Sequence, residues 1–189
     1  YNKEKVVVYN TYQLYRHDRL HFLKISHQLA VEGNFLLGAK LVRGAYLEKE
    51  RQKAHEDEYS EPLHVCKEDT DRDYDLGVEL CLKNIERVHF CMGTHNEASC
   101  LRLCDAMNAL QIPHNHPNIY FAQLLGMSDN ISYNLAASGY NVAKYVPYGP
   151  VDAVMPYLFR RAEENSSIAG QTSREFALLQ KEVNRRNNA

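Results

Sequence analysis

The chain has 189 residues, of which 44% are hydrophobic and 24% are charged, and its net charge is −2. This length allows one domain with a sizeable core, and the composition is ordinary for a soluble globular protein. The charge gives no indication of nucleic acid or an anionic membrane as the main partner. No apolar run approaches the roughly 20 residues of a membrane span.

The residues best suited to bind a metal are the five cysteines and a pair of histidines. The cysteines are odd in number, show no Cys-x-x-Cys spacing, and include Cys100 and Cys104 one helical turn apart in an apolar pattern. We interpret them as reduced core residues rather than metal ligands or disulfide partners, which fits a reducing compartment. His114 and His116 lie in a turn between prolines without a carboxylate partner, which favours a surface loop. No metal site is predicted.

Strand-like and helix-like patterns alternate along the chain. Apolar, β-branched runs predict strands at residues 6–11, 35–42, 88–92, 119–123 and 142–146, the first of them buried on both faces. Amphipathic stretches predict helices at residues 16–32, 47–55, 69–85, 97–110, 129–137, from 151 onward, and 173–183. Gly33 should end the first helix, and Asp69 or Thr70 should cap the third.

This alternation indicates a parallel β/α architecture with right-handed crossovers. A doubly wound sheet would usually carry Gly-x-Gly-x-x-Gly after its first strand, and that motif is absent. A (β/α)8 barrel places its chemistry just beyond the C-terminal ends of its strands, and polar and glycine residues gather there, at 10–13, 43–46, 94–96, 123–127 and 145–149. Because a barrel usually needs roughly 250 residues, we expect a single domain, 1–189, that forms the last five βα units of one.

The helix that begins at residue 151 carries two adjacent arginines. Tyr157, Arg160 and Glu164 share one side of it, and Arg161 stands about 100° away. Neighbouring guanidinium groups repel and are costly to desolvate together, so a pair beside a pocket indicates an anion between them, a carboxylate or a phosphate. The alternative is a solvated basic face with Glu164 as its counter-ion.

Five motifs follow one another along the chain: Ala39-Lys-Leu-Val-Arg-Gly-Ala-Tyr46, Gly93-Thr-His-Asn96, Gln123-Leu-Leu-Gly-Met127, Lys144-Tyr-Val-Pro-Tyr-Gly-Pro150 and Tyr157-Leu-Phe-Arg-Arg-Ala-Glu-Glu-Asn165. Together they resemble proline dehydrogenase, the flavin enzyme that opens proline catabolism. The resemblance extends from residue 6 to about residue 165. The residues of these motifs are more similar to those of the bacterial single-activity members than to those of the animal members.

The resemblance implies a distorted (β/α)8 barrel with FAD bound at the strand ends. It also implies oxidation of L-proline to Δ1-pyrroline-5-carboxylate, with a hydride passing from proline C5 to flavin N5 and electrons then passing to a membrane quinone. The implied location is the bacterial cytoplasm, with peripheral contact to the inner membrane. The alternative is the mitochondrial inner membrane or matrix.

The same motifs imply a proline site of basic, aromatic and apolar side chains: Arg160, Arg161, Glu164, Tyr145, Tyr157, Leu124 and Tyr46. The arginine pair would hold the carboxylate at two points, which is catalysis by positioning, and Glu164 would fix the pair. Tyr145 and Tyr157 would pack against the proline ring, and Tyr46 would close over the site. For Tyr157 and Leu124 the alternative is plain core packing.

The implied cofactor site comprises Asn10, Gln13, Lys40, Val42, Gly44, Ala45, Lys67, Thr94, His95 and Glu164. Lys40 would place a positive charge beside the reactive edge of the flavin, and the alternative is a lysine at the rim of the sheet. The match leaves open which of the two amides hydrogen-bonds the ring. Val42, Gly44 and Ala45 would let the backbone approach the cofactor. Thr94 and His95, at the start of a helix, would meet the phosphates or adenosine, and Lys67 would reach the pyrophosphate.

The resemblance begins only at the fourth strand of the barrel. The first three strands, which bring an acidic residue and a lysine to the proline site in the family, are not among these residues. A lone five-stranded sheet would expose an apolar edge, so we expect the chain to need those strands or another chain for activity. Two other functions stay open: a non-catalytic remnant or binding module on the same scaffold, and a barrel enzyme without flavin that clamps a phosphate.

Overall fold

The computed structural model describes the backbone of residues 1–167 and 169–188, and the side chains of residues 1–159 and 176–188. Within it the chain forms two compact units, Tyr1–Tyr145 and Val146–Ala189, each of which is described by itself. The prediction of a single domain therefore stays a prediction.

Strands and helices alternate through the first unit, and every predicted element is present with its predicted type. The elements are β1 (Asn10–Gln13), α1 (Arg19–Glu32), β2 (Leu37–Val42), α2 (Leu47–Glu56), α3 (Lys67–Lys83), β3 (Val88–Gly93), α4 (Glu97–Ala109), β4 (Ile119–Leu124), α5 (Asp129–Ala137) and β5 (Val142–Tyr145). The second unit holds α6 (Val151–Ser167) and α7 (Ala169–Asn187).

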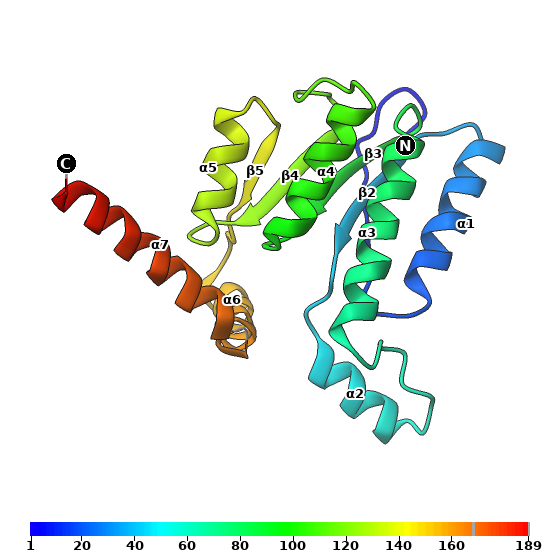
Figure 1. Ribbon diagram of the computed structural model, residues 1–189. Coiled ribbons are helices and arrows are strands. Elements are labelled where there is room, and N and C mark those ends of the chain that lie inside the picture. Colours follow the sequence, from blue (N-terminus) through cyan, green and yellow to red (C-terminus); the bar gives the residue numbers. More distant parts are fainter. Residues whose placement is uncertain (168, 189) are drawn as a thin grey trace. The chain divides into compact units, whose positions relative to one another are not determined.

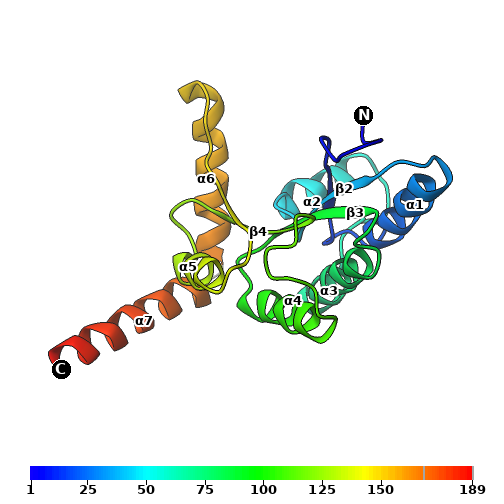
Figure 2. The ribbon, with the colours of Figure 1, turned by 90° about the horizontal axis from the view of Figure 1, so that it is seen from above.

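The five strands form one parallel sheet in which each strand pairs with the next along the chain, in the order β1-β2-β3-β4-β5. A doubly wound sheet would reverse its order in the middle, whereas a barrel wall would not. Successive right-handed crossovers place their helices on the same side, and α1, α3, α4 and α5 lie along one side of the sheet (Figure 1, Figure 2).

The core lies between the sheet and these helices. Alternate strand residues point toward the helices and are buried, and they pack with apolar residues of α1, α3 and α4: Leu37, Ala39, Leu41, Val88, Phe90, Met92, Ile119, Phe121, Leu23, Ala30, Val78, Leu82, Leu103 and Met107. The intervening residues point the other way, to a side that we call the open face; they include Lys40, Val42, Cys91, Tyr120 and Ala122.

The cysteines fit the core interpretation in part. Cys81, Cys100 and Cys104 are buried in the helix-side core, Cys91 is half-buried on the open face, and Cys66 is exposed. All five are free thiols. Burial raises the pKa of the Cys100 thiol to about 12, which keeps it protonated and unreactive.

The first strand is shorter and begins later than predicted, and its predicted burial on both faces is wrong. Val7 and Val8 are 54% and 52% exposed and precede β1. The side-chain oxygen of Asn2 (Oδ1) accepts hydrogen bonds from the backbone N–H groups of both valines, each at 3.0 Å. A Cβ on Gly38 would lie 2.3 Å from the Val8 carbonyl oxygen, so this segment crosses the open face at Gly38. Asn2 thus competes for backbone groups that would otherwise extend the strand.

The predicted cap of the third helix is also wrong. α3 begins at Lys67, and its N-cap is Cys66, which has an extended backbone. Asp69 lies in the first turn together with Glu68, where acidic side chains stabilise the helix through its dipole. The acidic residues therefore mark the start of the helix by their charge rather than as capping groups.

Candidate functional site

A contact between β2 and β5 brings two predicted site residues together on the open face. The Lys40 ammonium nitrogen lies 5.3 Å from the centroid of the Tyr145 ring, within the range of a cation–π interaction. In a flat sheet β2 and β5 would be three strand spacings apart, roughly 14 Å. The Lys40 and Tyr145 side chains therefore lean toward each other across the open face, an arrangement that curvature of the sheet around this face favours, as in the wall of a barrel.

The strand register distinguishes the two amides. Gln13 pairs with Val42 and so shares the open face with Lys40, whereas Asn10 pairs with Ala39, which faces the helices. The open face therefore carries the amide of Gln13, and the contacts of Asn10 and Gln13 with the flavin ring stay predictions. Leu124 pairs with Tyr145 at the end of β4 and also lies on this face.

The turn after β2 is tightly packed. Gly44 has φ +129°, and a Cβ there would lie 2.4 Å from two atoms of the Tyr15 ring. The Tyr15 hydroxyl donates a hydrogen bond to Glu50 of α2, and the Arg16 guanidinium contacts the same carboxylate at 2.6 Å. Burial and the neighbouring carboxylate raise the pKa of Tyr15, so it remains a donor. Gly44 is required by Tyr15, a reason for glycine that the sequence does not reveal.

Tyr46, Ala45 and Lys67 occupy the borders of this region. Tyr46 is the N-cap residue of α2 and is about one-third exposed, and Ala45 precedes it in the turn. Lys67 is the first residue of α3 and forms an ion pair with Asp71, and its side chain is largely exposed. Burial alone would raise the pKa of Asp71, but hydrogen bonds from Lys67 and Arg43 lower it.

The turn between β3 and α4 holds Thr94 and His95. Thr94 is 7% exposed, and its hydroxyl oxygen accepts a hydrogen bond from the backbone N–H of Asn96 at 3.1 Å. The Asn96 side chain caps α4 by accepting from the Ser99 N–H at 3.1 Å. His95 Nδ1 lies 2.9 Å from the hydroxyl of Ser128. The turn is thus fixed to the next strand-end loop and presents the N-terminus of a long helix.

His95 is uncharged at neutral pH. Burial, followed by the positive charge of Lys144, lowers its pKa to about 4. Lys144 is held by the Met127 carbonyl oxygen at 2.8 Å and by Asp129 at 2.7 Å. An anion at this turn would therefore meet hydrogen-bond donors and the helix dipole rather than an imidazolium.

This lowered pKa predicts a loss of stability in acid. An unfolded histidine binds a proton near pH 6.5 and the folded one only near pH 4, so the unfolded state holds more protons between these values. The free energy of unfolding should fall as the pH drops through this window, by about 2 kcal/mol at pH 4 after allowance for partial exposure. Urea denaturation of wild type and His95→Gln from pH 7.5 to 4 measures it. Parallel curves for the two proteins would contradict the assignment to His95.

The predicted substrate residues of the second unit lie on α6. Tyr157 is half-buried, and the helix spans the whole Tyr157 to Glu164 spacing that the sequence predicts. The side chains of Arg160, Arg161 and Glu164 lie outside the described residues, so their roles stay predictions.

A polar group to which the sequence motifs assign no role connects these elements. Arg43, beside the small residues of the β2 turn, donates to Thr94 at 2.8 Å, to Ser99 at 2.9 Å and to Asp71 at 2.5 Å. Its guanidinium carbon lies 4.1 Å from the centroid of the buried Tyr74 ring. Arg43 thus joins the end of β2 to α3 and to the turn before α4.

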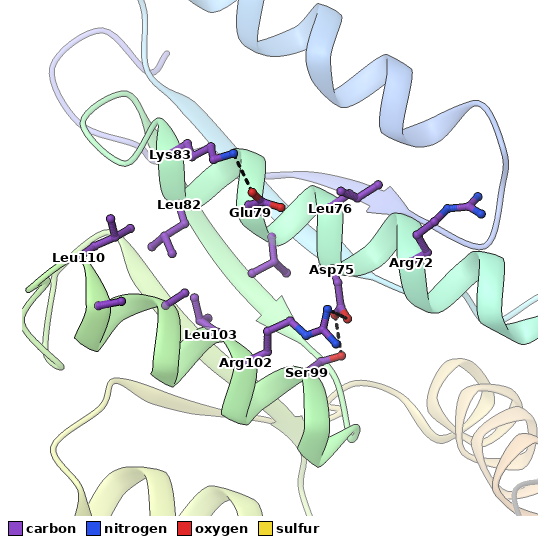
Figure 3. Close-up of a pocket in the computed structure, with 13 residues that line it drawn as sticks. Arg72, Asp75, Leu76, Glu79, Leu82, Lys83, Ser99, Arg102, Leu103 and Leu110 are labelled. Carbon is purple, nitrogen blue, oxygen red and sulfur yellow. Dashed lines mark hydrogen bonds and ion pairs between the residues drawn. The ribbon is translucent and has the colours of Figure 1, made fainter.

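A groove of about 440 Å³ lies between α3 and α4 (Figure 3). Its apolar lining includes Leu82, Leu103 and Leu110, and ion pairs of Lys83 with Glu79 and of Arg102 with Asp75 flank it. None of the predicted site residues lines it, and it lies on the helix side of the sheet. The groove is therefore separate from the candidate site.

Among the described residues there is neither a membrane-spanning helix nor a metal-binding cluster. No helix in them is both long enough and apolar enough to span a membrane. The same residues contain no group of three or more His, Cys, Asp or Glu side chains arranged to bind a metal. In line with the predicted loop, the His114 ring lies 2.8 Å from the Ser138 carbonyl oxygen, 2.9 Å from the Asn108 side-chain oxygen, and stacks on Tyr140.

Comparison with known proteins agrees with this arrangement. The family model described as "Proline dehydrogenase" matches residues 1–174. "Proline dehydrogenase 1, mitochondrial" of Homo sapiens is 41% identical over 189 residues, covering 98% of this chain and 32% of that protein. "Hydroxyproline dehydrogenase" of Xenopus laevis is 38% identical over 189 residues, covering 98% of this chain and 41% of that protein.

A solved structure shows the same fold. Proline utilization A (PutA) from Bdellovibrio bacteriovorus, inactivated by N-propargylglycine, matches with a TM-score of 0.78 at 27% identity, covering 83% of this chain and 16% of that chain. The 189 residues span well under half the length of each of these relatives. The (β/α)8 barrel predicted from the sequence is confirmed, with this chain forming five consecutive βα units of it. The chain belongs to the proline dehydrogenase family.

Proposed function

We propose that this chain carries the FAD- and proline-binding part of an enzyme that oxidises L-proline to Δ1-pyrroline-5-carboxylate. The observation that carries the proposal is the contact of Lys40 with Tyr145 on the open face of a curved sheet, in a chain of the proline dehydrogenase family. It joins a cation to an aromatic ring at the strand ends, where barrel enzymes hold their substrates.

The residues at the strand ends fit FAD. Lys40 and Gln13 share the open face and offer a cation and an amide to a flavin ring. The N-terminus of α4, with the neutral His95 beside it, offers donors to a diphosphate. Bound here, FAD would supply the acceptor chemistry for a hydride from C5 of proline and for onward transfer of electrons to a quinone.

The side chains of the chain supply position and charge. In the proposal Arg160 and Arg161 hold the proline carboxylate at two points, Glu164 keeps the pair in place, and Tyr157 packs against the ring. Lys40 places its positive charge where negative charge develops during the reaction. The proline amine must be neutral or lose a proton, because an ammonium cannot donate a hydride from the neighbouring carbon.

We further propose that residues beyond these 189 complete the barrel. The open face carries partly exposed aromatic residues, Tyr120 at 40% and Tyr145 at 47%, that the interior of a closed barrel would bury. The quinone acceptor implies peripheral contact with a membrane. The human relative is named as mitochondrial, and the Bdellovibrio neighbour is bacterial, so the proposed location is the mitochondrial inner membrane or matrix, or the bacterial cytoplasm at the inner membrane.

An absorbance scan of the purified chain with FAD, before and after addition of L-proline, tests the proposal. Flavin bands that bleach with L-proline are expected, and 4-hydroxyproline in a parallel cuvette separates the two activities named among the relatives. Retained flavin without bleaching would mean that the absent strands supply essential substrate contacts. A folded chain that retains no flavin, even when joined to those strands, would contradict the proposal and favour a remnant or a phosphate-binding barrel.

A further inference from the structure

The Arg43 side chain is the one described group that contacts both α3 and the turn before α4 by direct hydrogen bonds from the end of β2. Its three donor nitrogens each have an acceptor, on Asp71, Thr94 and Ser99. Its planar face lies over Tyr74, which is fully buried. A guanidinium with a hydrogen bond from each of its three nitrogens and one face stacked is held in a single orientation.

Two of the three acceptors of Arg43, Thr94 and Ser99, help to define the α4 N-terminus. Thr94 binds the Asn96 N–H, and Ser99 supplies the N–H that Asn96 caps. The Ser99 hydroxyl in turn donates to Asp75 of α3 at 2.8 Å. Removing Arg43 would leave Thr94 and Ser99, both under 10% exposed, short of a charged donor. The position of residues 94–99 relative to β2 therefore depends on this side chain.

The Arg43 side chain lies on the helix side of the sheet, so it does not contact a ligand on the open face. It follows Val42, which points to the open face, and its partners come from α3 and from the helix side of the β3 turn. Lys40, by contrast, stands on the open face with Tyr145. The two cations of this motif are therefore expected to have separate tasks.

We propose that Arg43 is a positioning residue that holds the turn at residues 94–96 in the orientation that binds the diphosphate of FAD. The identity of the ligand in this proposal rests on the proposed function, whereas the effect of Arg43 on the turn does not. Arg43 acts through Thr94 and Ser99 and makes no contact with the cofactor. Its removal should loosen the turn whether or not FAD is present, and should weaken FAD binding in consequence.

The first measurement is amide hydrogen exchange in the protein without FAD. In Arg43→Gln, exchange at residues 94–100 should be about 10- to 100-fold faster than in wild type, because charged hydrogen bonds to Thr94 and Ser99 are lost. Amides of β2 and β4 serve as the internal reference and should be nearly unchanged. Arg43→Lys, which keeps a cation near Tyr74, should show a smaller increase and guards against a variant that fails to fold.

The second measurement is FAD affinity by flavin fluorescence, with Arg102→Gln as the matched control. Arg102 contacts Asp75 at 3.3 Å in the same network, but it reaches neither Thr94 nor β2, and its side chain is 72% exposed. The Kd for FAD should rise about 10- to 100-fold in Arg43→Gln and stay at the wild-type value in Arg102→Gln.

The outcomes separate the two proposals. Unchanged exchange at residues 94–100 would overturn the positioning role, whatever the affinity for FAD. Faster exchange with an unchanged Kd would show that this turn does not bind the cofactor, which would also overturn it. Faster exchange in a protein whose wild-type form binds no FAD, even when joined to the strands that complete the barrel, would remove the proposed function and leave the link from Arg43 to the turn intact.

Discussion

Replacing either Arg160 or Arg161 with methionine is expected to lower kcat/KM for L-proline by about 10³. The proposed site holds the proline carboxylate between two adjacent guanidinium groups of α6. Loss of one partner leaves a desolvated carboxylate beside a single arginine, at a cost of about 4 kcal/mol, and each 1.36 kcal/mol is a factor of ten. Arginine to lysine at either position should recover only part of the loss, because an ammonium cannot form the planar paired contact.

The assay compares L-proline with L-prolinol, in which a hydroxymethyl group replaces the carboxylate. Wild type should prefer L-proline strongly, and the methionine variants should lose most of this preference while oxidising L-prolinol at similar rates. Arg185→Met is the control, since Arg185 lies on an exposed face of α7 and pairs with Glu182 at 2.7 Å. Equal losses for both substrates would mean that the arginines act on folding or on the cofactor. Unchanged proline kinetics would support a solvated basic helix face.

The sheet could be predicted from sequence because burial dictates its central strands. β3 and β4 each begin at the predicted residue and end one residue later than predicted, and α5 has its predicted bounds. These segments alternate between the helix-side core and the open face, so each carries a pattern that few other structures produce. The even succession of strand and helix fits a doubly wound sheet as well, so the strand order of a barrel is predicted from the absence of Gly-x-Gly-x-x-Gly and from the polar residues at the strand ends.

The prediction is wrong where a local polar group changes the backbone. Val6 to Val8 have strand-forming side chains, but Asn2 binds their backbone and the segment crosses the open face instead. No apolar pattern records such a competition, because it depends on one side chain several residues away. The start of α3 is a smaller case, in which a cysteine with an extended backbone precedes the acidic first turn.

In the candidate site, too, the motifs identify some residues, whereas other contacts are visible only in the structure. Lys40 and Tyr145 are identified from the family's motifs, and the structure adds that they meet across the curved sheet. Arg43 is not identified, because its acceptors lie 28, 51 and 56 residues away in sequence. Periodicity describes neighbours in the chain, and contacts at such separations leave no local signal. They become visible only when the strand ends are assembled.

Gly44→Ala is expected to lower the free energy of unfolding by about 4 kcal/mol in protein without FAD. The backbone at Gly44 has φ +129°, which alanine adopts only with strain. The added Cβ would also lie 2.4 Å from the Tyr15 ring, and that ring is buried and held by Glu50. Urea denaturation followed by circular dichroism measures the change, with the slope of the transition as a check that both proteins unfold alike.

Two other glycines separate the cost of backbone strain from the cost of the clash with Tyr15. Gly126 has φ +77° with nothing within 4 Å of a Cβ, so Gly126→Ala should cost only the backbone strain, about 1 kcal/mol. Gly77 lies inside α3 with its nearest contacts at 3.6 Å, so Gly77→Ala should stabilise by about 0.5 kcal/mol. In a Tyr15→Ala background the cost of Gly44→Ala should fall toward that of Gly126→Ala, because the clash is removed.

The same variants decide why a glycine occupies this turn. If Gly44 served only the approach of a cofactor, Gly44→Ala would leave the stability of FAD-free protein unchanged and reduce only the affinity for FAD. The contact with Tyr15 predicts the opposite order, with instability present before any ligand is added. Since Tyr15 and Glu50 connect this turn to α2, a loss of both stability and affinity would mean that one glycine serves the fold and the site together.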